Sequence, residues 1–438
     1  MATTTQIVET YLEPSSSTMK NSSGELPNPP LTPSTAEKGV GQSYIQAPPP
    51  LLTRLFYAST IAGLQGALRP AVWARELHRW WYGHSHTPDI VKTYEARPAL
   101  PVRIFFPKSY DLTSPKQLPC MITVHGGGFV VGQGQDDDVW NRTFADRFGY
   151  LVLGVGYNKA PWNPFPGPAE DVASLVLAIM GDGSLPVDKG KVSLLGFSAG
   201  GNLAVAASQS KEVRGLKGLG WGLRSVVVMY PPLDFTVGAR EKAERRRHYK
   251  GELKGVRGRP SDLLLPLAGS FDWAYIPYGT DKSDGRLSPG ARIAGNVLRE
   301  ELPDHVCVVG AELDMLAYEG WVFARKMAGL EFPRRDEEEK PVGRKEVGKE
   351  KGALVGESDD GEERFGFLRV DEGEEGQVRS VKWVLVPDVV HGFDMHIPPG
   401  IVGDEEGWVD GNGKGGMVMR EVVGWLEGVV YEEDEGEG

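Results

Sequence analysis

The stretch LLGFSAGGNLAVAA, residues 194–207, decides the fold because it sets a serine between an apolar strand and a helix. The run KVSLLG predicts the strand, and the small residues after Ser198 predict the helix. A sharp turn of this kind exposes the serine hydroxyl at the carboxyl end of the strand, where open α/β sheets bind ligands. Because the chain holds 57 glycines, Gly-x-Ser-x-Gly alone is weak evidence, and a glycine-rich turn without chemistry is the alternative. The context favours Ser198 as a nucleophile.

Apolar strands alternate with helices on both sides of this turn. Strands that are apolar throughout and alternate with helices indicate a mostly parallel central sheet with helices on both faces. The predicted fold class is therefore α/β. We expect strands in 102–107, 120–124, 150–158, 191–196, 225–230, 305–310 and 381–386, and helices in 139–149, 168–180, 198–209, 315–330 and 415–430.

Composition divides the chain into a core, two insertions and two tails. The N-terminal tail and one insertion have too few large apolar residues to offset the entropy of ordering them, so we expect the tail to be disordered and the insertion mostly so. The expected parts are a Ser/Thr/Pro-rich tail (1–50), N-terminal cap helices (51–95), a core (96–235 and 287–430), a cap insertion (236–286), an acidic low-complexity insertion (331–380) and an acidic tail (431–438).

Charge and cysteine content limit the partners and the compartment. A net charge of −12 argues against a nucleic-acid partner. Cys120 and Cys307 lie in apolar runs, so we expect both to be buried and unpaired, as in a reducing compartment. The N-terminus lacks the features of a signal peptide, and no run of about 18 apolar residues is present. We therefore expect a cytoplasmic protein without a transmembrane segment, of undetermined oligomeric state.

Residues 50–80 mix apolar and basic side chains at helical spacing. The favoured interpretation is a helix that packs over the site, because the segment joins directly to folded sequence. Peripheral contact with a membrane is the alternative.

A glycine loop upstream supplies candidate partners for a developing oxyanion. The motif HGGGFVVG follows the strand CMITV, and its glycines leave the backbone N–H groups uncovered. We expect the N–H groups of Gly127, Gly128 and Ala199 to form an oxyanion hole. His125 and Gly126 are expected to support the loop, with the imidazole ring bracing it.

A serine hydroxyl needs a base, and the base is expected on a loop after a late strand. His391, in VKWVLVPDVVHGFDM, meets this requirement. His396, five residues further on, is the near rival.

The base in turn needs an orienting acid, and three carboxylates follow the strand HVCVVG. Of Glu312, Asp314 and Glu319, Asp314 is best placed at the turn from strand to helix. Asp388, closer to His391 in sequence, is the alternative acid. The chain order Ser, Asp, His is the order of an α/β-hydrolase.

With these motifs the chain resembles the hormone-sensitive-lipase-like branch of the α/β-hydrolases. This group of carboxylesterases and lipases includes arylacetamide-deacetylase-like enzymes, and the resemblance spans roughly residues 95–330 and 381–430. The matching motifs, in order, are HGGGF (125–129), YNKAPWNPFPGPAED (157–171), GFSAGGNLA (196–204), LSP (287–289), ELDMLAYEG (312–320) and HGF (391–393).

The resemblance implies an α/β-hydrolase fold with a helical cap from about 50–90 and 236–286. It implies hydrolysis of small-molecule carboxylic esters with short to medium acyl chains through a Ser-His-Asp triad, and no metal or cofactor. Trp273, Tyr275 and Tyr278 either line the pocket or only pack the cap.

The chain departs from the family pattern in three places. Phe197 precedes the serine, where the family often has Asp or Thr. Tyr318 stands in AYEG, where Asp-Glu-Gly is common. The acid and the base are 77 positions apart, a connection that the family keeps short, and the acidic insertion accounts for the excess.

Two other functions remain open on the same scaffold. One is hydrolysis of an amide, carbamate or lactone in a biosynthetic pathway, because bond preference depends on the pocket and not on the triad. The other is a non-catalytic binding protein, against which the presence of the candidate base argues.

Overall fold

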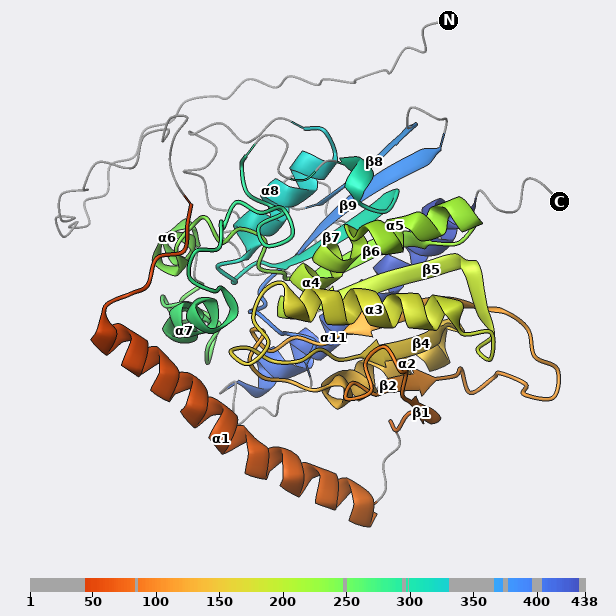
Figure 1. Ribbon diagram of the computed structural model, residues 1–438, viewed down its shortest axis with the longest axis horizontal. Coiled ribbons are helices and arrows are strands. Elements are labelled where there is room, and N and C mark those ends of the chain that lie inside the picture. Colours follow the sequence, from red (N-terminus) through yellow and green to blue (C-terminus); the bar gives the residue numbers. More distant parts are fainter. Residues whose placement is uncertain are drawn as a thin grey trace, which may run out of the picture. The chain divides into compact units, whose positions relative to one another are not determined.

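The computed structural model describes residues 44–82, 86–246, 250–293, 297, 299–330, 366–372, 377–395 and 404–432. In these residues nine strands form one sheet, and the central six, from β4 to β9, run parallel to one another (Figure 1). The α/β class with a mostly parallel sheet is confirmed. In sheet order the strands are β1 (Ile90–Lys92), β2 (Val102–Phe105), β4 (Leu151–Val155), β3 (Leu118–Val124), β5 (Val187–Phe197), β6 (Leu223–Met229), β7 (His305–Ala311), β9 (Val378–Val386) and β8 (Gly366–Glu372).

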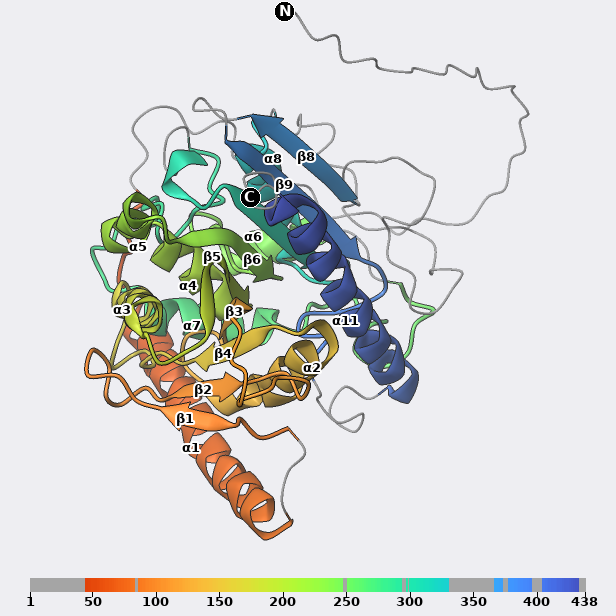
Figure 2. The ribbon, with the colours of Figure 1, turned by 90° about the vertical axis from the view of Figure 1, so that its right-hand side faces the viewer.

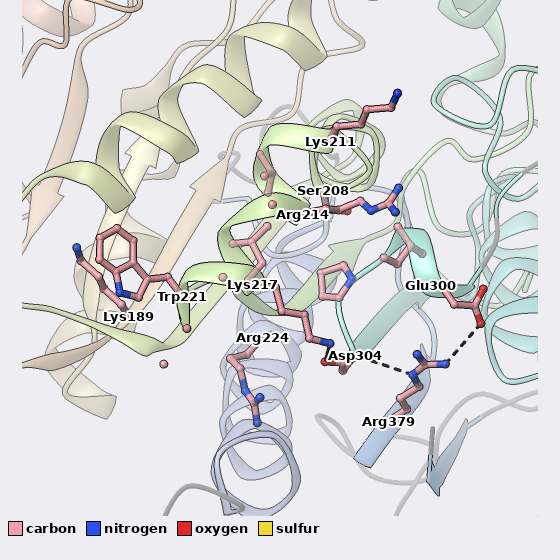
Figure 3. Close-up of a pocket in the computed structure, with 18 residues that line it drawn as sticks. Lys189, Ser208, Lys211, Arg214, Lys217, Trp221, Arg224, Glu300, Asp304 and Arg379 are labelled. Atoms are coloured by element: carbon pink, nitrogen blue, oxygen red, sulfur yellow. Dashed lines mark hydrogen bonds and ion pairs between the residues drawn. The ribbon is translucent and has the colours of Figure 1, made fainter. Parts of the chain in front are cut away.

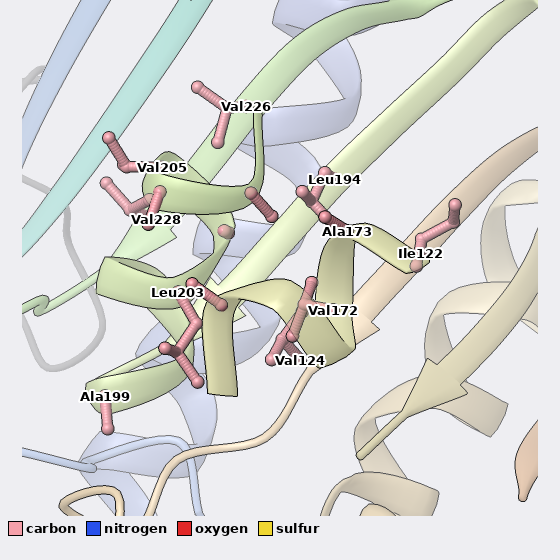
Figure 4. Close-up of a cluster of buried hydrophobic side chains, with 14 of the residues drawn as sticks. Ile122, Val124, Val172, Ala173, Leu194, Ala199, Leu203, Val205, Val226 and Val228 are labelled. Carbon is pink, nitrogen blue, oxygen red and sulfur yellow. The ribbon is translucent and has the colours of Figure 1, made fainter. Parts of the chain in front are cut away.

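Helices cover both faces of the sheet, as Figure 2 shows. Successive residues of a strand point to opposite faces, so Leu194 and Leu195 of β5 enter two different apolar clusters. The cluster on the first face includes Leu194, Leu203 and Val172 (Figure 4). The helices on this face are α3 (Gly167–Gly181), α4 (Ala199–Ser208) and α8 (Ala317–Met327), and those on the other face are α2 (Asp138–Phe148) and α11 (Glu405–Trp425), which continues as a π-helical turn (Leu426–Val430).

Two edge strands correct the predicted boundaries. β8 lies inside the stretch assigned to the disordered insertion, and β1 lies inside the stretch assigned to the cap helices. Both pair antiparallel with a strand of the core, β8 along its whole length with β9 and β1 with β2. Phe367 of β8 packs against the apolar core. Pairing with a neighbouring strand orders segments whose composition alone does not predict a strand.

The remaining predicted insertion, residues 236–286, carries two helices. They are α6 (Ala239–Arg245) and α7 (Leu265–Tyr275). A single long helix, α1 (Leu51–Tyr82), packs along α7, with the rings of Tyr57 and Trp273 6.3 Å apart (Figure 1). Tyr275 stacks at 3.6 Å on Phe129 of the HGGGF segment, and so joins the cap to the core. The Trp273 indole donates to Tyr278, and this contact lies within the cap insertion.

Other expectations on the sequence have mixed outcomes. Cys120 and Cys307 are both buried free thiols, as predicted. No helix in the described part of the chain is long and apolar enough to cross a bilayer. His396, residues 1–43 and residues 331–365 lie outside the described residues.

Candidate active site

Ser198 sits at a strained turn that close backbone packing maintains. Its φ of 51° and ψ of −121° are unfavourable for a residue with a side chain, and its N–H donates to the Met229 carbonyl at 2.8 Å. A Cβ on Gly196 would lie 2.1 Å from the carbonyl oxygen of Gly200. A Cβ on Gly200 would lie 2.2 Å from the carbonyl oxygen of Val124. These glycines are required because the backbone of β3 and of α4 passes where a side chain would be.

The three predicted triad residues meet at the carboxyl end of the sheet. His391 Nε2 lies 2.8 Å from Ser198 Oγ, and His391 Nδ1 lies 2.6 Å from Asp314 Oδ2. With a proton on Nδ1, the imidazole donates to Asp314 and accepts from the serine hydroxyl. The Asp314 side chain is completely buried and that of His391 is 10% exposed. This arrangement suits removal of the serine proton by the imidazole.

The charge around His391 favours its protonated form. Burial opposes the imidazolium, but the charge and hydrogen bond of Asp314, with the charges of Asp262 and Asp394, outweigh it and raise the pKa of His391. A raised pKa makes the imidazole a stronger base. It also means that the neutral form is lost as the pH falls through that raised value.

Asp314 is fixed by the backbone of the segment that carries it. The Leu316 N–H donates to Asp314 Oδ1 at 3.0 Å, and the Met315 N–H donates to Asp262 Oδ2 at 2.9 Å. Burial and the nearby charge of Asp314 raise the pKa of Asp262. Two carboxylates therefore lie at this turn, and Asp314 is the one bonded to His391.

The other candidate acids have different partners. Asp388 pairs with the ammonium group of Lys250. Glu312 accepts from Lys250 at 2.8 Å and from the Asp388 N–H at 2.7 Å. Glu319 accepts from the Leu233 N–H and pairs with a lysine of α6. All three hold the cap or the core together rather than orient the imidazole.

The glycine loop lies directly beside the serine turn. A Cβ on Gly126 would lie 3.3 Å from the Ser198 Cβ. Gly127 and Gly128 have φ values of 114° and 57°, and no backbone carbonyl of the described residues accepts from either N–H. Ala199 is the first residue of α4, so its N–H has no hydrogen-bond acceptor within that helix. Three donors are thus available next to the serine hydroxyl.

A ring from the cap closes over this loop. A Cβ on Gly128 would lie 2.5 Å from the ring of Phe271 on α7, so only glycine fits there. Gln65 of α1 donates to the carbonyls of Val130 and Ala160, at 2.9 and 3.1 Å. Both cap elements therefore contact the loop or the chain that supports it.

His125 lies beneath the glycine loop and is fully buried. Its Nδ1 is 2.7 Å from the Gly126 carbonyl oxygen, its Nε2 is 3.0 Å from the Lys159 ammonium, and its ring stacks on Tyr157 at 4.5 Å. Burial, together with Lys159, lowers the pKa of His125 well below its usual value. Burial also lowers the pKa of Lys159 to about 7. The imidazole is therefore neutral, and its contacts are those of a support for the loop.

Sequence reasoning missed Tyr230 and Asp394. The Tyr230 ring stands edge-on to His391 at 4.7 Å, and its hydroxyl donates to Asp394 Oδ1 at 2.5 Å. Burial raises the pKa of Asp394 to about 6. Two features of the sequence could have pointed to them. Tyr230 lies at the carboxyl end of a predicted strand, and Asp394 comes three residues after the candidate base.

A small cavity adjoins the imidazole. Its volume is about 50 Å³, and apolar side chains from the insertion, the His391 loop and the start of α11 form most of its wall. They include Val256, Leu263, Val390, Phe393 and Trp408. The cavity suits a small apolar group held next to the base.

Comparisons with known proteins bear on the fold and on the class of enzyme. Residues 121–335 match the family described as alpha/beta hydrolase fold. The chain is 29% identical over 254 residues to ethyl acetate hydrolase from Pseudomonas putida, covering 56% of this chain and 72% of that protein. It is 32% identical over 142 residues to human arylacetamide deacetylase-like 2, covering 31% and 34%. It is 32% identical over 231 residues to an arylesterase from Saccharolobus solfataricus, covering 52% and 66%.

Solved structures share the fold at lower identity. An esterase from Pyrobaculum calidifontis aligns with a TM-score of 0.51 at 20% identity, covering 78% of this chain and 86% of that chain. An ester-hydrolase from the metagenome of Lake Arreo aligns with a TM-score of 0.50 at 21% identity, covering 86% and 99%. The chain is therefore an α/β-hydrolase of the carboxylesterase type, and it is similar to the hormone-sensitive-lipase-like branch of that fold.

Proposed function

We propose that this chain hydrolyses carboxylic esters through an acyl-enzyme on Ser198. The observation that carries the proposal is the continuous hydrogen-bonded path from Asp314 through His391 to Ser198, with steps of 2.6 and 2.8 Å. Activation by an adjacent base is what a serine hydroxyl needs to become a nucleophile.

In the first half of the reaction Ser198 Oγ attacks the ester carbonyl while His391 Nε2 takes the hydroxyl proton. The imidazolium, stabilised by Asp314, then gives this proton to the leaving alcohol as the carbon–oxygen bond breaks. In the second half a water molecule attacks the acyl-enzyme, and the same imidazole takes and returns its proton. The products are the carboxylic acid and free Ser198.

The oxyanion of each tetrahedral intermediate is assigned to the N–H groups of Gly127, Gly128 and Ala199. Their position beside the serine supports this role, because fixed donors stabilise charge that develops in the transition state. We also propose a short to medium acyl chain, since the Phe271 ring and the small cavity beside His391 leave little room.

A panel of p-nitrophenyl esters of increasing chain length, with matching anilides and a lactone, tests the reaction. We expect the highest kcat/KM on short esters, and at least a roughly 10³-fold loss of kcat in Ser198→Ala. Ser174→Ala, a serine substitution on α3, is the matched control and should keep full activity. A fluorophosphonate probe should label the wild type but not Ser198→Ala.

Two results would contradict this proposal. If the folded wild type is not labelled and cleaves no ester, the chain is a binding protein on this scaffold. If the anilide or lactone is preferred over every ester, the bond assignment is wrong while the triad stands.

We further propose that α1 contacts a lipid surface. The side of α1 that faces away from the core carries exposed Leu52, Trp73 and Trp81, which are 81%, 71% and 70% accessible. The helix contains four arginines and one glutamate, a net charge of +3, in a chain of net charge −12. Apolar and aromatic residues with flanking arginines suit an anionic membrane interface. Flotation of the full chain with anionic vesicles tests this, and full retention in the soluble fraction would overturn it.

A further inference from the structure

A second cavity lies at the opposite end of the sheet from the serine. Its volume is about 620 Å³ (Figure 3). Lys189 lies near the start of β5 and Arg224 is the second residue of β6, while Asp304 precedes β7 and Arg379 is the second residue of β9. Ser198 follows the last residue of β5, and these four strands are parallel, so the cavity is at their amino ends. The proposed hydrolase mechanism uses none of its residues.

The wall of this cavity is strongly basic. It contains two carboxylates, Glu300 and Asp304, against six cations from five separate segments, an excess of four positive charges. Glu301, outside the wall, lies 3.9 Å from Arg214 and reduces the excess by one. The chain as a whole carries a net charge of −12, so this local excess is opposite in sign to the protein. The six cations are Lys189, Lys211, Arg214, Lys217, Arg224 and Arg379.

The carboxylates of the wall are already shared among these cations. Asp304 lies 2.8 Å from the Lys217 ammonium and 3.7 Å from the Arg379 guanidinium, and Glu300 lies 3.5 Å from Arg379. Most of these side chains are partly exposed, where ion pairs are weak and leave the local potential positive. The excess charge thus remains available to an anion that enters the cavity.

The basic side chains also act on two buried neighbours. Burial and then the charges of Arg224, Arg299 and Lys217 lower the pKa of His305 to about 4, while Asp304 opposes them. Burial and then the charge of Arg379 lower the pKa of Arg299 to about 10, against the opposing charges of nearby carboxylates. Nearby positive charge disfavours further cations, and it favours bound anions for the same reason.

One side of the cavity is aromatic. Trp221 is part of the wall, is 36% exposed, and lies under the Lys189 ammonium, which is 3.4 Å from the ring centroid. Figure 3 shows these two side chains together on one side and Arg379 with Glu300 on the other. Cations on opposite sides of one cavity suit a ligand with several negative charges rather than a single small ion.

We propose that this cavity binds a molecule carrying several phosphate groups, at a site separate from Ser198. Guanidinium forks bind phosphate oxygens in pairs and lysine ammonium groups bind them as point charges, and the wall offers three of each. A soluble oligophosphate and a phosphorylated lipid headgroup share this chemistry. The site is independent of the esterase proposal, because no triad residue takes part.

Titration calorimetry of the full chain with sodium tripolyphosphate tests the site. We expect saturable binding at one site, and at least an about tenfold weaker affinity in Lys189→Glu/Lys211→Glu, since two attractive charges become repulsive. Arg240→Glu, an exposed charge reversal on α6, is the matched control and should bind within about twofold of the wild type. Ser198→Ala should bind like the wild type, which separates this result from the hydrolase proposal.

Retained hydrolysis of p-nitrophenyl acetate shows that the double variant is folded. If the double variant does not fold, Lys217→Ala replaces it, because this change truncates a side chain that is 67% exposed. It should also weaken the affinity for tripolyphosphate. In a parallel arm, vesicles containing a phosphoinositide are sedimented with the chain. Binding that tripolyphosphate displaces and that the double variant lacks identifies a lipid headgroup as the source, whereas binding of the soluble probe alone identifies a soluble ligand. Absence of saturable binding in both arms, or equal binding by the wild type and the double variant, would overturn the site.

Discussion

The two halves of the active site are held in place by different forces. The serine turn and the glycine loop are held by backbone atoms in direct contact, as at Gly196 and Gly200, where no Cβ fits. The cap is held to the core by buried ion pairs. Lys242 pairs with Glu319, and Lys250 with Glu312 and Asp388.

The serine turn and the glycine loop must keep one shape, whereas the cap must be attached in one position. Backbone packing fixes the serine turn and the glycine loop without any charge. A buried ion pair contributes little net stability because both groups lose water, but an incorrectly docked cap would leave such charges unpaired. Burial raises the pKa of Glu319 to about 7, although the charge and hydrogen bond of Lys242 oppose this rise.

The most damaging change should be in the glycine half. A methyl group in Gly200→Ala meets the backbone carbonyls of Val124 and His125 at 2.2 and 2.5 Å. Val124 ends the central strand β3, so a shift there would disturb its pairing with β4 and β5. We expect a loss of more than about 4 kcal/mol in the free energy of unfolding, or no folded protein. Gly181→Ala is the matched control, because nothing lies within 4 Å of its Cβ, and should change stability by less than about 1 kcal/mol. Equal denaturant midpoints for the two variants would show that the turn is not held by packing.

A smaller loss is expected in the cap. Lys250→Met leaves the carboxylates of Glu312 and Asp388 buried without their cation, which should lower the free energy of unfolding by about 3–5 kcal/mol. Lys254→Met, at an exposed lysine of the same insertion, should change it by less than about 0.5 kcal/mol. Urea unfolding of both variants measures the difference. A Lys250 variant as stable as the wild type would show that charge does not dock the cap.

The smallest effect on stability is expected on the outer side of α1. Replacing Leu52, Trp73 and Trp81 together with serine removes side chains that are mostly exposed, so the unfolding free energy should change by less than about 1 kcal/mol. Hydrolysis of p-nitrophenyl acetate should also be unchanged, while the fraction that floats with anionic vesicles should fall about tenfold. If this variant is instead unfolded under native conditions, these three side chains are needed for the packing of the cap.

The core of the fold could be predicted because its signals are local. Each central strand is a continuous apolar run, and the glycines of the serine turn, Gly196 and Gly200, lie close to Ser198 in the sequence. β8 was missed because its order comes from pairing with β9, which composition does not report. The pairs of Lys242 and Lys250 were missed because a basic run in a sequence does not reveal which distant carboxylates it reaches.

Phe197 shows a different limit. The sequence marked it as a departure from the family, and the structure places its ring edge-on to Trp140 at 5.3 Å, inside the apolar cluster on the α2 face of the sheet. The apolar core therefore continues up to the residue before the nucleophile. Only the packing of α2 against β5 explains an aromatic side chain at this position.

The long separation in sequence between Asp314 and His391 has a consequence for loop-closure entropy. The chain leaves the sheet after Ala311 and returns to it first at Gly366, in β8, and then at Val378, in β9. The parallel pairing of β9 with β7 brings Asp314 Oδ2 to within 2.6 Å of His391 Nδ1. Doubling the length of such a connection costs only about 0.6 kcal/mol, far less than the pairing of a strand provides. The length of chain between these two residues is thus nearly neutral for stability, and the contact of Asp314 with His391 does not depend on it.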